Sequence, residues 1–333
     1  MMKRKIAALM MTAVLAVSML AGCGSEGTSG GDTQKTDDTE KTIKIGVIQL
    51  AEHPALDASC QGFVDGLKEA GYEDGKNIEI IYENAQGEQA NCQTIAEKLV
   101  NDKVDLILAI ATPAAQAVAN KTKDIPILVT AVTDPASSGL VDTNEVPGGN
   151  VSGTSDLTPV KEQIALLKDL IPDAKTVGIL YCSAEDNSKF QANIAMETLK
   201  SNGLTGAEYT FSKLDEIQGV VDSMKGKVDA IYIPTDNMAA EGMATISMIA
   251  TEAGLATIVG ESGMVDNGGL ATYGLSYYNL GRLTAEQAVS ILKGEAETAT
   301  MPIGYLEAAD CEFSYNKDTA AALGITVDPS KYE

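Results

Sequence analysis

Short apolar runs alternate with helical patterns from residue 42 to residue 156. Runs of Ile, Val and Leu bounded by turn residues are typical of buried strands, and apolar residues spaced three and four apart indicate helices. The predicted strands lie at 42–50, 77–85, 104–111 and 125–132, and the segment 150–156 closes this block. The predicted helices lie at 54–70, 90–101 and 113–123. This alternation predicts βαβ units and a parallel sheet covered by helices on both faces.

A second block repeats the pattern. Its predicted strands lie at 176–183, 207–213, 229–236, 255–262 and 269–276, and its predicted helices at 159–170, 188–202, 215–225 and 239–253. One more helix is predicted at 279–293, and a short one near 319–323. A folded region of roughly 290 residues exceeds the usual size of a single core, so we expect two domains. Ligands of such sheets bind beyond the carboxyl ends of the strands, which predicts a site in a cleft between the two halves.

The first 22 residues have the pattern of a signal peptide. Three basic residues precede an apolar run that is too short to span a bilayer, and "LAGC" then places small residues directly before Cys23. This spacing resembles a bacterial lipobox, in which the cysteine is lipidated after cleavage; the alternative is a plain secretory signal. Residues 23–41 contain no aliphatic or aromatic residue and predict a flexible tether. The expected location is the extracytoplasmic face of a bacterial cell membrane, with a lipid anchor.

Charge and cysteine content exclude several kinds of site. The chain has 47 acidic and 24 basic residues, a net charge of −23, which argues against nucleic-acid binding. A single histidine and the absence of CxxC and HExxH patterns give no support for a metal site. Cys60 and Cys92 each lie on an apolar helical stripe, so both are expected to be buried apolar side chains rather than halves of a disulfide.

The stretch "LAIATPAAQAVANK", at 108–121, joins a predicted strand to a predicted helix. Thr112 is a suitable N-cap, and Pro113 suits the first helical position because it has no N–H to leave unpaired. The small side chains of Ala114 and Ala115 leave the backbone N–H groups of the first turn uncovered. Such a helix end attracts anions. The alternative is an ordinary capped helix.

Polar residues gather after the predicted strands in both halves. Each one alone is more commonly a cap or a turn residue, but several such clusters at corresponding strand ends predict a binding site. The clusters comprise Gln49, Glu52, His53, Thr112, Thr133, Asp134, Ser183, Asn187, Ser188, Thr235, Asp236, Asn237, Glu261 and Ser262.

The ordered set of motifs "GVIQLAEHPALDASCQGFVDGLKEAGY", "ATPAAQ", "VTDP", "PTDN", "GGLATYGLSYYNLGR" and "ILKGE" follows the lipobox. Together they resemble the ABC-transporter substrate-binding lipoproteins of the tryptophan and aromatic amino-acid group. The resemblance implies an α/β class I periplasmic-binding-protein fold, with two Rossmann-like lobes whose parallel sheets are joined by a three-crossover hinge. It places residues 42–156 and 271–298 in lobe 1, and residues 157–270 and 299–333 in lobe 2. It also implies a bound amino acid that is not chemically changed, no cofactor, and an ABC permease and ATPase as partners.

A bound amino acid needs donors for its carboxylate and acceptors for its ammonium. The resemblance and the strand-end pattern together assign the carboxylate to Thr112 and to the N–H groups of Ala114 and Ala115, with Thr133 as an additional hydroxyl. Asp236 is the first choice for the ammonium, with Asn237 beside it.

Asp134 and Glu261 are alternative partners for the ammonium. Ser183, Asn187 and Ser188 are expected to close over the ligand. Gln49 and His53 are further ligand-binding candidates, the histidine as a side-chain-pocket or hydrogen-bonding residue.

The choice of ligand stays open at this level. The chain has no tryptophan, so Tyr273, Tyr277 and Tyr278 are candidates for the pocket wall beside Pro, Met and Ala. An aromatic amino acid is expected, and a branched aliphatic amino acid or another small polar solute is the alternative. A sensory module for a membrane receptor would use the same closure on a ligand. A hydrolase or dehydrogenase is disfavoured because residues 42–333 contain no GxSxG and no GxGxxG follows the first strand.

Overall fold

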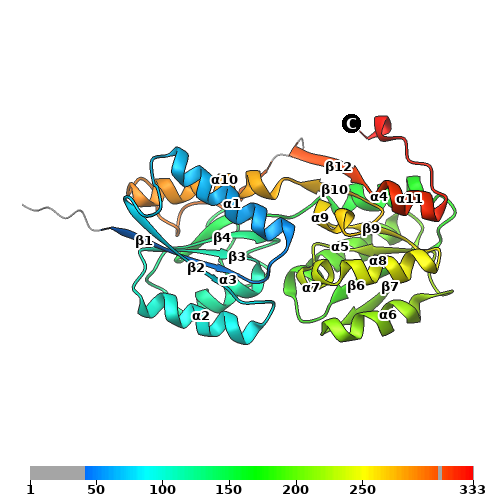
Figure 1. The fold of residues 1–333 in the computed structure, drawn as a ribbon, viewed down its shortest axis with the longest axis horizontal. Helices are drawn as coiled ribbons and strands as arrows, with labels where there is room; N and C mark the ends of the chain where they lie inside the picture. The colour runs from blue at the N-terminus through cyan, green and yellow to red at the C-terminus, as the bar shows by residue number, and fades with distance from the viewer. Residues whose placement is uncertain (1–41, 307–309, 333) are drawn as a thin grey trace, which may run out of the picture. The chain divides into compact units, whose positions relative to one another are not determined.

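The computed structural model describes residues 42–306 and 310–332 (Figure 1). The predicted signal peptide, the lipidation site Cys23 and the predicted tether lie outside these residues. The described residues form two six-stranded sheets, ordered β11-β5-β4-β3-β1-β2 and β12-β10-β9-β8-β6-β7. We call the first sheet with its helices lobe 1, and the second sheet with its helices lobe 2.

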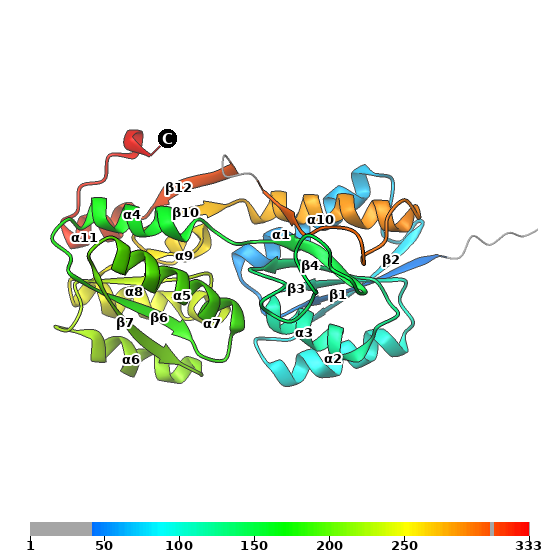
Figure 2. The ribbon, with the colours of Figure 1, turned by 180° about the vertical axis from the view of Figure 1, so that it is seen from behind.

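Lobe 1 is a parallel α/β layer structure. Its strands are β1 (Ile43–Gln49), β2 (Ile78–Asn84), β3 (Leu106–Ile110), β4 (Ile127–Val132), β5 (Val151–Ser155) and β11 (Gly304–Tyr305). Its helices are α1 (Pro54–Glu69), α2 (Gln89–Asn101), α3 (Thr112–Lys121) and α10 (Tyr277–Leu292). Figures 1 and 2 show α1 and α10 on one face of the sheet, and α2 and α3 on the other. Strands β1, β3, β4 and β5 are buried over most or all of their length because helices cover both faces.

Lobe 2 repeats this arrangement with one antiparallel edge strand. Its strands are β6 (Thr176–Cys182), β7 (Thr205–Phe211), β8 (Ala230–Ile233), β9 (Ala256–Val259), β10 (Ala271–Leu275) and β12 (Cys311–Tyr315), and β12 runs antiparallel to β10. Its helices are α4 (Val160–Leu170), α5 (Asp186–Ser201), α6 (Ile217–Met224), α7 (Asn237–Glu241), α8 (Met243–Glu252), α9 (Ser262–Asp266) and α11 (Lys317–Leu323), with 3-10 turns at Leu214–Glu216 and Pro329–Lys331. Two apolar clusters cover the two faces of the sheet, one with α4 and α5 and the other with α6 and α8.

The division of the chain between the lobes differs from the sequence-based one at two boundaries. Strand β10 pairs with β9 and β12 in lobe 2, so the chain returns to lobe 1 after Leu275 and not at residue 271. Strand β11 pairs with β5 in lobe 1, so the last passage follows Tyr305 and not residue 298. Strand pairing joins segments far apart in the sequence, which local patterns do not reveal.

Two local differences also separate the structure from the prediction. The helix predicted at 239–253 is two helices that meet at Gly242. The predicted strand 255–262 ends at Val259, and Ser262 begins the short helix α9.

Helices α1 and α10 pack unusually close together through glycines. A Cβ atom on Gly281 would lie 1.9 Å from the Ser59 carbonyl oxygen, and one on Gly62 would lie 2.0 Å from the Tyr278 carbonyl oxygen. This contact fixes α10 to lobe 1, as the sequence predicted for the helix at 279–293.

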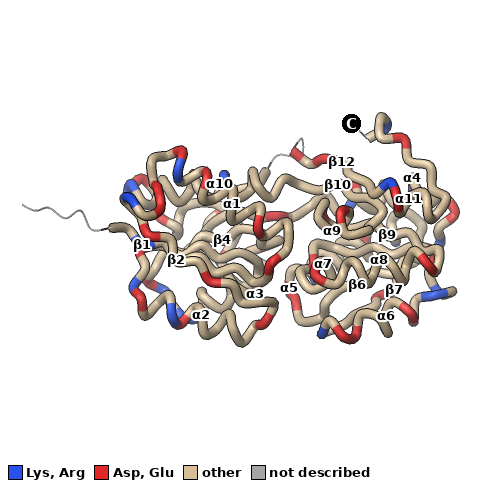
Figure 3. Tube along the Cα trace, viewed as in Figure 1, with Lys and Arg blue, Asp and Glu red and all other residues tan. Residues whose placement is uncertain are grey.

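Acidic residues are spread over the surface of both lobes (Figure 3). The four cysteines within the described part of the chain are free, and Cys92 is buried whereas Cys60 is half-buried. Among the described residues, no helix is both long and apolar enough to cross a membrane.

Candidate functional site

A small cavity lies between the carboxyl ends of the strands of the two lobes. Its volume is about 20 Å³, which is room for roughly one water molecule. An amino acid could therefore enter only after the lobes move apart. The cavity is lined by His53, Leu56, Ala131, Thr133, Asp156, Asn187, Thr235, Asp236, Asn237, Ala240, Glu261 and Tyr277. Seven polar residues of the sequence-predicted clusters are among them: His53, Thr133, Asn187, Thr235, Asp236, Asn237 and Glu261.

Three lining residues carry buried acceptor atoms without a hydrogen-bond partner. They are Oδ1 of Asp156, Oδ1 of Asn187 and Nδ1 of His53. Buried polar atoms of folded proteins are nearly always paired. The carboxylate and amide oxygens only accept, so whatever occupies this cavity must bring hydrogen-bond donors.

Asp156 directly follows β5 and is almost fully buried. Its Oδ2 accepts a 2.8 Å hydrogen bond from the Tyr277 hydroxyl, which leaves Oδ1 free. Burial raises the pKa of Asp156, and the hydrogen bonds from Tyr277 and Thr133 oppose this shift. In the sequence, Asp156 was assigned only as a lobe boundary. The available signal was a polar residue at the end of a predicted buried strand, the same signal that selected Thr133 and Asp236.

Asp236, the first choice for the ammonium, accepts hydrogen bonds from two backbone N–H groups of lobe 2. Its Oδ1 accepts a 2.7 Å hydrogen bond from the Ala239 N–H and caps α7, and its Oδ2 accepts one of 2.6 Å from the Cys182 N–H. Burial, and then the nearby charge of Glu185, raise the pKa of Asp236 to about 7. Both of its oxygens therefore already accept backbone hydrogen bonds, whereas Oδ1 of Asp156 has no hydrogen-bond partner among the described residues.

The two alternative carboxylates, Glu261 and Asp134, also accept hydrogen bonds from backbone N–H groups. Glu261 caps α9, with hydrogen bonds of 2.5 Å from the Gly263 N–H and 2.8 Å from the Met264 N–H. Burial raises the pKa of Glu261 to about 7.

Asp134 lies outside the cavity lining. It accepts hydrogen bonds of 2.6 Å from the Ser137 N–H and 2.9 Å from Nδ2 of Asn144. Its carboxylate therefore holds the loop that follows β4.

The start of α3 differs from the predicted cap. The N-cap residue is Ala111, whose φ of +81° makes a tight turn after β3, and Thr112 is the first helical residue. The Thr112 hydroxyl caps nothing and is buried without a partner. Ala115 donates its N–H to the Ala111 carbonyl at 3.0 Å, so this N–H is not available to a ligand, contrary to the prediction. The turn moves the helix start by one residue, which cap preferences alone do not predict.

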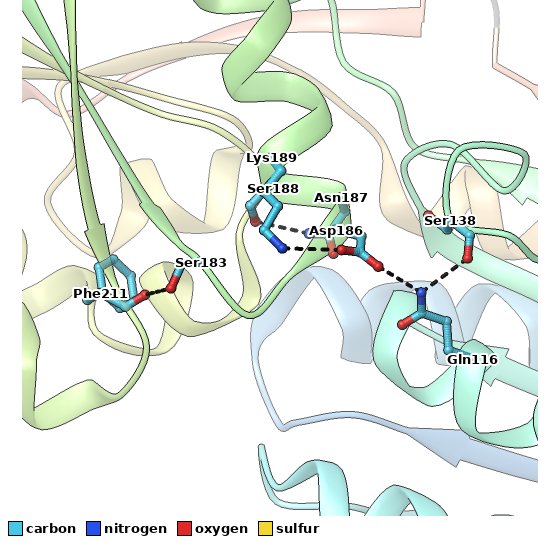
Figure 4. A network of polar contacts seen from close by, with 8 residues as sticks. All are labelled: Gln116, Ser138, Ser183, Asp186, Asn187, Ser188, Lys189 and Phe211. Carbon is cyan, nitrogen blue, oxygen red and sulfur yellow. Dashed lines mark hydrogen bonds and ion pairs between the residues drawn. The ribbon is translucent and has the colours of Figure 1, made fainter.

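Other predicted contacts lie outside the cavity lining. The Ser183 hydroxyl donates to the Phe211 carbonyl at 3.2 Å (Figure 4), and Ser188 Oγ accepts from Nδ2 of Asn187 at 3.2 Å. Gln49 is fully buried and donates from Nε2 to the Ala51 carbonyl at 2.7 Å. Ala114 is buried within the first turn of α3.

Only one of the three candidate tyrosines lines the cavity. Tyr277 does so, whereas Tyr273 belongs to an aromatic cluster of lobe 2 with Phe313 and Tyr332, and Tyr278 is exposed.

Hydrogen bonds between the lobes surround the cavity. Gln191 of α5 donates from Nε2 to Oγ1 of Thr133 at 3.2 Å, and Gln116 of α3 donates to Oδ2 of Asp186 at 3.1 Å (Figure 4). His53 Nε2 lies 3.4 Å from Oδ1 of Asn237. Such contacts can form only while the two lobes are close together.

Similar proteins were found by sequence and by structure. The chain is 41% identical over 333 residues to a tyrosine-binding protein of Clostridioides difficile, which covers 99% of this chain and 96% of the relative. The structure of an ABC domain in complex with L-Trp from Streptococcus pneumonia is 39% identical, with a TM-score of 0.83. The ligand-free, open structure of a substrate binding protein with adhesive properties from Clostridium difficile is 46% identical, with a TM-score of 0.68. Each structural match covers 87% of this chain and 97% of the other.

Sequence identity and TM-score rank the two structural matches in opposite order. The open, ligand-free protein has the higher sequence identity but the lower TM-score. The lobes of the present chain are therefore arranged more as in the L-Trp complex, in agreement with the small cavity and the hydrogen bonds between the lobes. Residues 44–330 match the family of ABC transporter substrate binding proteins, and the chain belongs to this family and has its class I periplasmic-binding-protein fold.

Proposed function

We propose that this protein binds an aromatic amino acid between its lobes and delivers it to an ABC permease. The observation that carries the proposal is the buried, unpaired Oδ1 of Asp156 in the interlobe cavity. A buried carboxylate with a raised pKa is stabilised in its charged form by a cation, and the ammonium of an amino acid supplies both the charge and the N–H donors. The Tyr277 hydroxyl holds the other oxygen and so orients the carboxylate.

The carboxylate of the ligand is assigned to the N-terminus of α3, whose Thr112 and Ala114 lie outside the lining of the present small cavity and would meet a ligand only in a wider cleft. The Thr112 hydroxyl there is buried without a partner, and the first N–H groups of a helix have no acceptor within the helix. The positive end of the helix dipole adds a favourable interaction with an anion.

The side chain of the ligand is assigned to the apolar part of the lining. Leu56 of α1, Ala131 of β4 and Ala240 of α7 come from both lobes and offer small or aliphatic surfaces. A ring buries much apolar area against such walls. The tyrosine-binding relative and the L-Trp complex, at 41% and 39% identity, support an aromatic ligand for this chain.

The proposal is tested by binding measurements with the purified protein and all twenty amino acids. Aromatic amino acids should raise the melting temperature, and the shift should grow with the logarithm of ligand concentration above Kd. The chain has no tryptophan, so indole emission in a titration with L-tryptophan comes from the ligand alone and should shift to the blue on burial. Tight binding of a branched aliphatic amino acid, or no shift with any amino acid, would contradict the proposal.

We further propose that the protein acts outside the cytoplasm, anchored by a lipid on Cys23. Family membership supports uptake from outside the cell and binding without chemical change of the ligand. The basic and apolar N-terminal run before "LAGC" supports the anchor. Uptake of labelled ligand during growth on limiting tyrosine or tryptophan, measured with and without the gene, separates transport from a sensory role. Loss of a transport protein should reduce uptake, whereas loss of a sensory module should not.

A further inference from the structure

His53, Asn237 and Glu185 form a chain of polar contacts across the cleft. His53 is the N-cap residue of α1 in lobe 1, and Asn237 begins α7 in lobe 2. His53 Nε2 lies 3.4 Å from Oδ1 of Asn237, and Nδ2 of Asn237 donates to Oε2 of Glu185 at 2.6 Å. Glu185 precedes α5 and is buried.

Glu185 determines which way the Asn237 amide faces. The Glu185 side chain accepts from the backbone N–H groups of Asn237 at 3.2 Å and Met238 at 3.1 Å, and from Nδ2 of Asn187 at 3.1 Å. A group surrounded by donors acts as an acceptor, so the NH₂ of Asn237 must face it. The reversed amide would place an oxygen against the carboxylate. Oδ1 of Asn237 therefore faces His53.

The orientation of Asn237 in turn determines the tautomer of His53. An amide oxygen only accepts, so the hydrogen bond requires the proton on Nε2 of His53. Burial lowers the pKa of His53, which keeps the ring neutral with one N–H. Nδ1 is then a bare acceptor, and it is buried without a partner in a residue that lines the cavity.

We infer that His53 Nδ1 accepts a hydrogen bond from the ring of the bound amino acid, so that the cleft selects tyrosine and tryptophan over phenylalanine. The inference rests on the proposed function and names the part of the ligand that His53 contacts. The phenol O–H of tyrosine and the indole N–H of tryptophan are donors, whereas the phenylalanine ring has none. A phenylalanine complex would leave Nδ1 buried and unpaired.

The strand order places the two proposed ends of the ligand at different strands of the lobe 1 sheet. His53 follows β1 and Asp156 follows β5, and the order β5-β4-β3-β1 separates these strands by three spacings. Three spacings amount to about 14 Å. A ligand whose ammonium meets Asp156 and whose ring reaches His53 would run past Ala131 of β4, and the lobes must separate beyond the present cavity of about 20 Å³ to admit it.

Closure of the lobes completes the recognition. Asn237 and Glu185 belong to lobe 2, so the contact that places the proton on Nε2 exists only when lobe 2 lies against α1. Asn237 is therefore a positioning residue, and His53 is the residue that contacts the ligand.

The first test compares ligands on the purified protein by calorimetry. L-tyrosine should bind about tenfold or more tightly than L-phenylalanine and O-methyl-L-tyrosine, which lack the donor, because a buried acceptor left unpaired is costly. In His53→Phe, which keeps a ring but has no nitrogen, tyrosine and phenylalanine should bind within about threefold of each other. Gln116→Ala is the matched control, because it removes an interlobe hydrogen bond outside the cavity. Its tyrosine-to-phenylalanine ratio should equal that of the unaltered protein.

The second test uses NMR, because the chain contains a single histidine whose ring signals need no assignment. Nitrogen-15 NMR of the tyrosine complex should show the proton on Nε2, and the Nδ1 resonance should differ between the tyrosine and phenylalanine complexes. In Asn237→Ala the tyrosine-to-phenylalanine affinity ratio should fall, because no acceptor then holds the proton on Nε2 of His53 in the closed state.

The outcomes separate this inference from the proposed function. A proton on Nδ1 in the tyrosine complex, or an unchanged tyrosine-to-phenylalanine ratio in His53→Phe, would overturn the role of His53 and leave aromatic binding intact. An equal loss of affinity for all amino acids in His53→Phe would assign Nδ1 to the ammonium and also overturn it. Failure of the unaltered protein to bind any aromatic amino acid would overturn the proposed function itself.

Discussion

Replacement of Asp156 by asparagine removes the charge that we assign to the ligand ammonium and keeps the shape of the side chain. Asparagine can still accept the Tyr277 hydrogen bond, now 2.8 Å long at Oδ2. Truncation of one member of a buried, hydrogen-bonded charge pair costs about 2–5 kcal/mol in binding. Because about 1.4 kcal/mol corresponds to a factor of ten, Kd for L-tyrosine should rise roughly 30-fold to several thousandfold.

The same change should not harm the ligand-free protein. Burial raises the pKa of Asp156, so its charged form is disfavoured in the folded state and opposes folding near neutral pH. Asp156→Asn should therefore leave the melting temperature of the ligand-free protein unchanged or raise it. Weaker binding together with undiminished stability distinguishes a ligand contact from a structural one.

Calorimetry with L-tyrosine and thermal unfolding without ligand measure the two effects. Asp134→Asn is the matched control, because Asp134 also follows a strand of lobe 1 but lies outside the cavity and holds Ser137 and Asn144. It should reduce stability and change Kd less than threefold. A folded Asp156→Asn protein with Kd within twofold of the original would refute the assignment and move the ammonium to Asn187.

Three further outcomes are expected. Burial raises the pKa of Asp236 and of Glu261 to about 7. The stability that these carboxyls contribute is therefore fully present near pH 4 and is lost as the pH rises through about 7. The melting temperature of the ligand-free protein should fall over this range, and it should fall less in Glu261→Gln, which cannot lose a proton at this position. Gly281→Ala should lower the free energy of unfolding by about 1–3 kcal/mol in urea titrations, because the new Cβ would meet the Ser59 carbonyl oxygen at 1.9 Å; unchanged stability would contradict the close packing of α1 on α10. Cys23→Ser should move the protein from the membrane fraction to the soluble fraction with Kd unchanged, and retention in membranes would contradict the lipid anchor.

Short-range patterns in the sequence were sufficient for the elements and the class of fold. Strands such as Leu106–Ile110 and Ile127–Val132 are almost entirely apolar because both faces of a parallel sheet are covered, and the intervening helices carry apolar residues at helical spacing. Of the polar residues at the ends of the predicted strands, His53, Thr133 and Asn237 line the cavity.

The tertiary structure alone decided which polar groups the fold uses and which it leaves free. Asp236 and Asp156 both follow a strand, yet Asp236 accepts from the Cys182 N–H, 54 positions away, whereas Oδ1 of Asp156 has no hydrogen-bond partner within the described residues. The tautomer of His53 likewise depends on Asn237, 184 positions away. Hydrophobic periodicity is a property of neighbouring residues and can be read from the chain, but the pairing of a hydrogen-bonding atom depends on segments that meet only after folding.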